Sequence, residues 1–384
     1  MHDRQAQAEG VLAPIPYLSI IYIFFFSRIL CGSLIYWGHS NRIFLELVPG
    51  GWEGVPNWLI NPWTTYDSIW YLQIASQGYQ VHTTAFFPLY PLILRLFGPD
   101  SINMALAGVV ISNVSFFIAL VLIYRLTTLE WGENVALTTL WVIALCPAAP
   151  FFGAVYTESL FIALMAATFL AARRHHWWLA GLAGGAAALL RNPGFLIAGA
   201  LLLEAWQNRQ DKRLAKWITW LIPLGAFIGV QVYFWVRFGN PMAGLDSQGY
   251  FHRTLDWPWV PLLGDLRILI NGNYNFGIFL VTISGLLFTL LGLASPFIGW
   301  RKISLGYYLL IFGITLMNLV YARQIPPYTI SATRYLASLF PVAQMIALSF
   351  VKIQNSQAKL LFFGLYFFVF VMFNLMFGDK GFLG

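Results

Sequence analysis

Long apolar runs recur throughout this chain, and they constrain its fold more than any other feature. Apolar residues make up 59% of the 384 residues and charged residues only 10%, whereas soluble domains carry about 25% charged residues. So few charged side chains cannot coat the surface that water-soluble domains of this total length would expose. We therefore expect an integral membrane protein whose surface is covered mostly by the lipid bilayer.

Eleven of these runs approach the length of a membrane span. A helix needs about 20 apolar residues to cross the roughly 30 Å of hydrocarbon in a bilayer, and the three runs around residue 180 are the shortest. The runs are residues 15–37, 102–124, 135–150, 159–172, 177–190, 195–206, 217–238, 276–298, 305–321, 335–351 and 360–377. The sequence thus predicts an all-α polytopic bundle of about 11 transmembrane helices, with residues 1–384 forming a single membrane domain.

Basic residues predict the orientation of this bundle, because short cytoplasmic loops are enriched in lysine and arginine. The most basic connecting segments are 173–174, 209–216, 301–302 and 352–359. If they are cytoplasmic, the N-terminus lies inside, and two long loops at about 38–101 and 239–272 lie outside. This topology requires that residues 86–97, which are too short to span, dip into the membrane and return without crossing it.

The first long outer loop carries the most informative pattern. Residues 63–91 read WTTYDSIWYLQIASQGYQVHTTAFFPLYP, and residues 68–77 suit a short interfacial helix. Asp67 directly precedes that helix. Its carboxylate can cap the helix N-terminus, or it can act as a general base that removes a proton from an acceptor hydroxyl. The sequence leaves both roles open.

Three further charged residues fall on the same predicted outer face. Glu158 begins a span, where it can complement the helix dipole or take part in catalysis. Arg191 lies in a break between two short spans and Arg334 at the mouth of another. Each arginine can reach the interface by snorkelling or can pair with a phosphate. Two acids, two arginines and an aromatic loop on one face indicate a site for an anionic substrate at the lipid surface.

Several kinds of chemistry have no support in the sequence. There is no glycine-rich phosphate loop, paired zinc-ligand helix or serine elbow. There is also no Asp-x-Asp motif of the kind that holds a metal-bound nucleotide sugar. His39, His82 and His252 are too scattered to indicate a metal, and the basic residues form no stripe for nucleic acid. We expect no metal, no cofactor and no nucleic-acid partner.

Five motifs follow one another in an order that resembles a known family. The first is Tyr66-Asp67 with Trp70-Tyr71, Ile74-Ala75, Gly78-Tyr79 and Ala85-Phe86-Phe87-Pro88-Leu89-Tyr90-Pro91. The others are Tyr156-Thr157-Glu158-Ser159-Leu160-Phe161, Arg191-Asn192-Pro193-Gly194, Phe238-Gly239-Asn240-Pro241 with Gln248, and Arg334-Tyr335 with Pro341. Together they resemble the PIG-V type mannosyltransferases, or GPI mannosyltransferase 2 family, over nearly the whole chain. One departure is Tyr66, where the family usually has tryptophan before the acidic residue.

The resemblance implies a GT-C fold and a glycosyltransferase, more specifically a mannosyltransferase. It implies inverting transfer of mannose from a polyprenyl-phosphate carrier to a glycan or lipid hydroxyl on the non-cytoplasmic face. Asp67 would then be the catalytic base, and Glu158 would be a second catalytic residue with an acidic side chain. Arg191 and Arg334 would bind the donor phosphate. The expected substrate-binding residues are Tyr66, Trp70, Tyr71, Tyr79, Phe87, Gln248, His252 and Tyr335.

Other functions and locations are compatible with the same sequence. The same fold can use another lipid-linked sugar. A transporter or flippase would need ionisable residues near mid-membrane and two related halves; Arg28 is the one candidate for such a charge, and no repeat is visible. A bacterial plasma membrane is favoured over the endoplasmic reticulum because the chain is short and lacks a retention tail.

Overall fold

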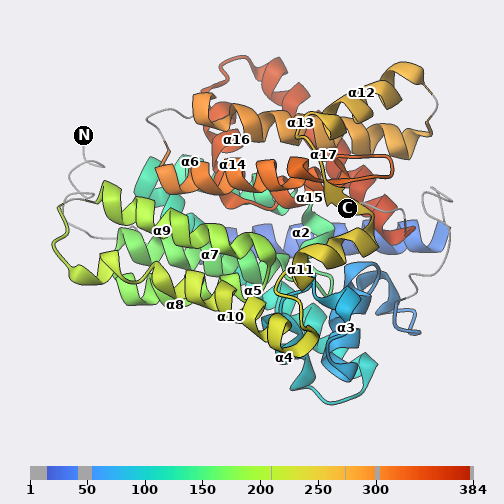
Figure 1. Ribbon diagram of the computed structural model, residues 1–384. Coiled ribbons are helices and arrows are strands. Elements are labelled where there is room, and N and C mark those ends of the chain that lie inside the picture. Colours follow the sequence, from blue (N-terminus) through green and yellow to red (C-terminus); the bar gives the residue numbers. More distant parts are fainter. Residues whose placement is uncertain (1–14, 42–53, 209, 273, 299–302, 381–384) are drawn as a thin grey trace.

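The computed structural model describes residues 15–41, 54–208, 210–272, 274–298 and 303–380. Residues 1–14 and residues 42–53 of the first outer loop lie outside the described residues, as do the basic positions Arg209, Arg301 and Lys302. The described chain is predominantly helical, with a single pair of short strands among the described residues (Figure 1). This agrees with the all-α prediction.

Five helical segments among the described residues are long and apolar enough to cross a membrane. They are α2 (Tyr17–Asn41), α5 (Ser101–Trp131), the segment Leu214–Phe238 that includes α10 (Leu221–Phe238), α13 (Phe276–Ile298) and α17 (Ser356–Gly378). A sixth span arises if α15 (Ile330–Ala337) and α16 (Phe340–Lys352), which are bent by 79° at their junction, are taken together. The long apolar helices indicate a multi-pass membrane protein.

The other predicted spans form shorter helices. They are α6 (Glu133–Ala144), α7 (Glu158–Arg173), α8 (Trp177–Ala188), α9 (Leu196–Gln207) and α14 (Leu305–Val320). Helices of 12 to 16 residues are about 18–24 Å long, which is less than the hydrocarbon thickness. Prolines explain why α6 and α8 end where they do, because Pro147 follows α6 and Pro193 separates α8 from α9. Each of the eleven runs contains a helix, but the count of eleven transmembrane helices is not confirmed.

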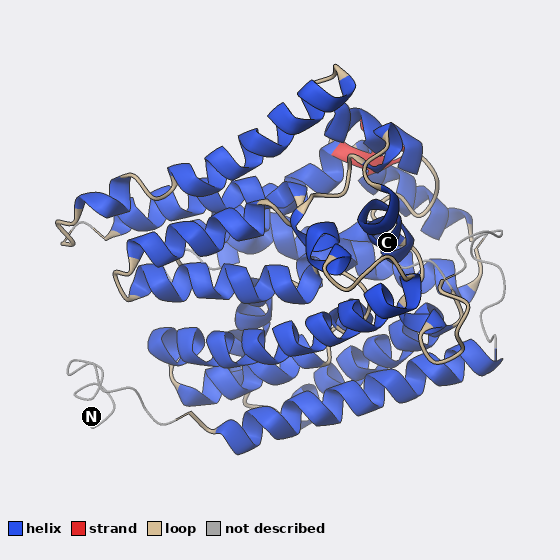
Figure 2. Ribbon diagram, turned by 90° about the horizontal axis from the view of Figure 1, so that it is seen from below, coloured by secondary structure: helices blue, strands red, loops and turns tan. Residues whose placement is uncertain are grey.

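The longer helices run side by side, and the short elements gather at one end of the bundle (Figures 1 and 2). These are α3 (Asp67–Gln77), α4 (Leu89–Arg95), α11 (Ala243–Asp246), α12 (Val260–Asn271) and the strands β1 (Arg253–Leu255) and β2 (Tyr321–Arg323). The 3₁₀ turns are η1 (Asn61–Trp63), η2 (Val81–Thr83), η3 (Ala149–Phe152), η4 (Asn192–Phe195), η5 (Leu214–Trp217) and η6 (Ser247–Phe251). The strands are antiparallel and place Arg253 opposite Arg323.

The first long loop contains two short helices, α3 and α4, where the sequence predicts an interfacial helix and a segment too short to span the membrane. The predicted interfacial helix is α3, which begins one residue earlier than expected, at Asp67. The segment 86–97 contains α4, whose seven residues cover about 10 Å, so it is too short to cross the membrane. It packs against α3 and α5, and the Tyr90 hydroxyl lies 3.4 Å from the carbonyl oxygen of Gly108 in α5.

Basic segments that the sequence placed on one side do meet in the structure. The Arg213 guanidinium donates to the carbonyl oxygen of His175, and the Lys216 ammonium donates to that of Asn208 over 2.7 Å. The loop joining α9 to α10 lies at the end of the bundle opposite the strands (Figure 1). The loop joining α9 to α10 is therefore separated along the bundle from the end that carries the strands, and the orientation of the bundle in a membrane stays a prediction.

Candidate functional site

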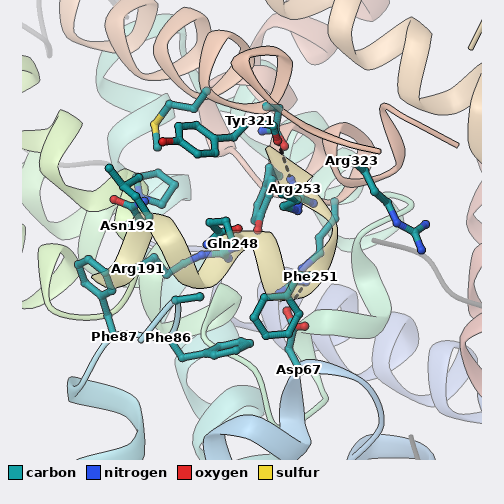
Figure 3. Close-up of a pocket in the computed structure, with 18 of the residues that line it drawn as sticks. Asp67, Phe86, Phe87, Arg191, Asn192, Gln248, Phe251, Arg253, Tyr321 and Arg323 are labelled. Carbon is teal, nitrogen blue, oxygen red and sulfur yellow. Dashed lines mark hydrogen bonds and ion pairs between the residues drawn. The ribbon is translucent and has the colours of Figure 1, made fainter. Parts of the chain in front are cut away.

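A cavity of about 1780 Å³ opens among the short elements at the end of the bundle that carries the two strands. Its walls come from α3, η4, α10, η6, β1, α14, β2 and α15, which are far apart in sequence. Figure 3 shows Asp67, Arg191, Arg253 and Gln248 around the same space. The two long loops that the sequence predicts to be outer and the C-terminal helices thus contribute to one site.

The turn that presents Asp67 has an unusual backbone. Tyr66 has a φ of 57°, which costs a non-glycine residue energy and is kept only where the surroundings hold it. Here the Tyr156 hydroxyl accepts a 3.2 Å hydrogen bond from the backbone N–H of Asp67 and donates to the carbonyl oxygen of Thr65 over 3.3 Å. Tyr156 therefore bridges the backbone on both sides of Tyr66 and holds the turn.

Asp67 does not cap the helix. The N-cap position is Tyr66, and no side chain forms a capping hydrogen bond there. The expectation that Asp67 is an N-cap is thus wrong, because α3 begins one residue earlier and Asp67 is already its first helical residue. Its carboxylate is turned instead to Arg334, whose Nη1 lies 2.6 Å from Asp67 Oδ2. The Asp67 side chain keeps 24% of its surface exposed.

Four charged side chains form a continuous network, of which three line the cavity and the fourth, Glu158, lies behind its wall. The Arg334 Nε donates to Glu158 Oε1 over 2.6 Å, and Arg191 Nη1 lies 2.8 Å from the same oxygen. The order is therefore Asp67, Arg334, Glu158, Arg191, with alternating charge. Buried charges are tolerated when they are paired and hydrogen-bonded in this way. Motifs that are up to 267 residues apart in the chain are joined by these contacts.

Aromatic rings enclose both arginines. The Arg334 guanidinium lies 4.8 Å from the ring centre of Phe151 and 4.7 Å from that of Tyr156, and the Arg191 guanidinium lies 4.8 Å from that of Tyr335. Such cation–π contacts hold guanidinium groups in place. Arg334 and Arg191 are only 3% and 8% exposed, so the snorkelling alternative is wrong for both.

Glu158 is completely buried in the first turn of α7 and does not line the cavity. It contacts the site through Arg334 and Arg191. A positioning role, through these two arginines, fits this placement better than the direct catalytic role expected from the sequence. Its place at the positive end of the helix also favours the ionised carboxylate.

Most of the expected substrate-binding residues line the cavity. These are Tyr66, Trp70, Tyr71, Phe87, Gln248, His252 and Tyr335. Tyr79 does not line it: the Tyr79 hydroxyl donates to the carbonyl oxygen of Phe86 over 2.7 Å, and its ring packs 5.2 Å from that of Phe234. Tyr79 therefore supports Phe86 from behind the cavity wall.

Two arginines that the sequence analysis did not single out also line the cavity. Arg253 and Arg323 lie opposite each other on β1 and β2. The Arg253 guanidinium donates to the carbonyl oxygen of Tyr321 over 3.3 Å and to the Ser331 hydroxyl. Burial, together with the positive charge of Arg253, lowers the pKa of Arg323. Their position in or beside predicted outer segments could have marked both arginines as candidates for the site. The pairing of the two strands could not be predicted from the sequence.

No cluster of three or more histidine, cysteine, aspartate or glutamate side chains is placed to hold a metal ion in the described part of the chain. The charged groups that converge on the cavity are arginines and one carboxylate. Such a set is suited to an anionic ligand and offers one group that can accept a proton.

Comparison with solved structures places this arrangement in a known fold. The crystal structure of an oligosaccharyltransferase from Archaeoglobus fulgidus, in the apo form, superposes with a TM-score of 0.51 at 13% sequence identity. The match covers 94% of this chain but only 56% of that one, so this chain spans little more than half its length. At this identity the likeness shows the fold alone, which is of the GT-C type.

A second structure describes the oligosaccharyltransferase AglB of the same organism, in complex with an inhibitory peptide and a dolichol-phosphate. It superposes with a TM-score of 0.47 at 14% identity, covering 95% of this chain and 56% of that one. No curated protein sequence matches this chain.

Comparison with family models gives a direct result. The model described as mannosyltransferase (PIG-V) matches residues 24–205, a region that contains Asp67, Glu158 and Arg191. The resemblance to the PIG-V mannosyltransferase family, first indicated by the motifs, is thereby confirmed over this region.

Proposed function

We propose that this protein is a membrane mannosyltransferase that takes mannose from a polyprenyl-phosphate carrier. The acceptor is a hydroxyl of a glycan or lipid on the non-cytoplasmic face, and the anomeric carbon is inverted. The observation that carries the proposal is the partly exposed Asp67 carboxylate, held by Arg334 at 2.6 Å in the wall of a large cavity. The family match and the GT-C fold support the same class of reaction.

In the proposed step, Asp67 accepts the proton of the acceptor hydroxyl. The acceptor oxygen forms a bond with the anomeric carbon of mannose, and the bond from that carbon to the phosphate oxygen breaks. The electron pair of the broken bond leaves with the phosphate, so the products are the mannosylated acceptor and polyprenyl phosphate. General base catalysis of this kind contributes about 10²- to 10⁴-fold to the rate.

The network around Asp67 suits this role because it fixes the carboxylate before substrate binds. Arg334 is anchored by buried Glu158, and Glu158 is held in turn by Arg191. Groups that are oriented in advance need not reorganise in the transition state. The aromatic residues Trp70 and Tyr71, which line the cavity beside Asp67, provide apolar faces against which a sugar ring can stack.

The proposal is tested with purified protein in lipid nanodiscs, polyprenyl-phosphate mannose and a panel of glycan and lipid acceptors. We expect release of free carrier only in the presence of a suitable acceptor, and a product of inverted configuration. Polyprenyl-phosphate glucose and arabinose in parallel test the use of another sugar. Inactivity with mannose across the whole panel, alongside activity with another donor, would overturn the assignment of the sugar.

A further inference from the structure

A buried carboxylate of the second long loop lies outside the cavity. Asp265 belongs to α12 and is completely buried, but it does not line the cavity. Burying a carboxylate costs free energy unless hydrogen bonds satisfy its oxygens. The partners of Asp265 therefore indicate what this side chain does in the fold.

The Asp265 carboxylate is bound by the two residues that directly precede α15. The backbone N–H of Tyr328 donates to Asp265 Oδ1 over 2.7 Å, and the backbone N–H of Thr329 donates to Oδ2 over 2.9 Å. The Thr329 hydroxyl donates to Oδ2 as well. Thr329 is the N-cap residue of α15, and its own side chain makes no capping hydrogen bond. Asp265 thus supplies, from another helix, acceptors that the start of α15 lacks within the helix itself.

Two glycines allow neighbouring helices to approach the same two residues closely. A Cβ atom on Gly264 of α12 would lie 2.6 Å from the Tyr328 ring, and one on Gly285 of α13 would lie 2.7 Å from the carbonyl oxygen of Thr329. Neither position has room for a larger side chain. The start of α15 is therefore held between α12 and α13.

The position of α15 matters to the site because this helix carries Arg334. Arg334 lies five residues beyond Thr329, about 7.5 Å along the helix axis, and its Nη1 lies 2.6 Å from Asp67 Oδ2. Helix α15 has only eight residues, and the chain bends by 79° at its other end. Its placement thus depends on contacts near its start, where Arg253 also donates to the Ser331 hydroxyl.

We infer that Asp265 is a positioning residue for sugar transfer: it fixes the start of α15 and thereby sets the place of the Arg334 guanidinium beside Asp67. The inference deepens the proposed function and rests on it, because it assigns to the second long loop a part in the same reaction. Asp265 does not line the cavity, so it acts through Arg334.

Asp265→Ala is the main test, in the full chain in lipid nanodiscs with polyprenyl-phosphate mannose and an acceptor. It removes all three hydrogen bonds, and a misplacement of about 1 Å caused by a remote substitution can cost about 10²-fold in rate. We expect kcat to fall by about tenfold to a hundredfold, with the KM for the donor unchanged. A wild-type kcat in this variant would overturn the inference.

Two further variants separate positioning from charge and from general effects of the loop. Asp265→Asn keeps one acceptor oxygen, and asparagine caps helices about as well as aspartate does, so it should recover most of the lost kcat. Asp246→Ala is the matched control, because Asp246 lies in the same long loop but is exposed and does not line the cavity. It should transfer sugar at the wild-type rate. Equal losses in Asp265→Ala and Asp246→Ala would contradict a specific role for Asp265.

A double-mutant cycle tests whether Asp265 acts through Arg334. Residues that act on the same contact give effects that are not additive. In a protein that already carries Arg334→Lys, the further change Asp265→Ala should therefore lower kcat by much less than it does in the wild type. A full additional loss would show that Asp265 acts elsewhere and would overturn the inference.

Hydrogen–deuterium exchange over residues 328–337 provides a measurement that does not depend on activity. Asp265→Ala should raise exchange in this segment, and Asp246→Ala should leave it unchanged. If Asp265→Ala does not fold, as judged by thermal unfolding, Thr329→Val decides, because it removes the hydroxyl that donates to Asp265. We expect its kcat to fall by about threefold to tenfold, and a wild-type kcat would overturn the inference.

Failure of the proposed function and failure of this inference give different results. Raised exchange in Asp265→Ala, in a protein whose wild type transfers no sugar, would refute the proposed function and leave the hold on α15 standing. Sugar transfer by the wild type and by Asp265→Ala at the same rate would refute this inference alone.

Discussion

Asp67 and Arg334 are 267 residues apart in the sequence, and Arg334 Nη1 donates to Asp67 Oδ2 over 2.6 Å. The same guanidinium donates through Nε to Glu158. A planar guanidinium can donate hydrogen bonds to two carboxylates at once in fixed directions, which an ammonium group cannot do. The contact therefore joins the first outer loop to the C-terminal helices through one side chain.

Replacing Arg334 with lysine tests this double contact. Arg334→Lys keeps the charge but should reach only one of the two carboxylates, so Asp67 loses its fixed orientation. We expect transfer to slow by about 10²-fold, with most of the loss in kcat. Initial rates over a range of acceptor concentrations separate kcat from KM. A variant with normal kcat would show that the orientation of Asp67 does not depend on the guanidinium fork.

Glu158→Gln tests the anchor of the network. Removing this carboxylate leaves Arg191 and part of Arg334 buried without their main partner, and breaking a buried ion pair costs about 3–5 kcal/mol. Thermal unfolding followed by intrinsic tryptophan fluorescence should show a clear fall in Tm. Glu133→Gln is the matched control, because Glu133 also lies in the first turn of a helix but is exposed. Equal, small changes in both variants would contradict the anchoring role.

Tyr156→Phe tests the turn at Tyr66. The lost hydroxyl bridges the backbone of Thr65 and Asp67, so stability should fall by about 0.5–1.5 kcal/mol. Transfer should slow by about tenfold to a hundredfold as Asp67 shifts.

Tyr308→Phe is the control for that substitution. The Tyr308 hydroxyl is buried and has no hydrogen-bond partner in the described part of the chain, so its removal should be neutral or slightly stabilising. If the two phenylalanine variants behave alike in both measurements, the bridge at Tyr156 has no special role.

The sequence predicted the elements of this fold well and their lengths less well. Apolar composition locates helices because lipid and core both accept apolar side chains. It cannot say whether a run such as 177–190 ends early, which depends on local breaks like the one at Pro193. The bend of 79° between α15 and α16 was also not predicted, because both helices lie within or beside one apolar run.

The sequence predicted which residues lie at the site better than it predicted the contacts between them. Asp67, Arg191 and Arg334 do line one cavity, as their shared predicted face implied. The contacts among them were not predicted, because pairing depends on the three-dimensional structure: Glu158 is buried between two arginines. Arg253 and Arg323 were missed because a three-residue strand pair joins segments almost 70 residues apart, and short strands leave almost no periodic signal.

The role of Asp67 as the base is tested by the rate at which Asp67→Asn releases the carrier in a single-turnover assay with saturating acceptor. Asparagine keeps the size of the side chain but cannot accept a proton at neutral pH. We expect a rate about 10²- to 10⁴-fold below that of the wild type. A variant that releases the carrier at the wild-type rate would contradict the claim that Asp67 is the base.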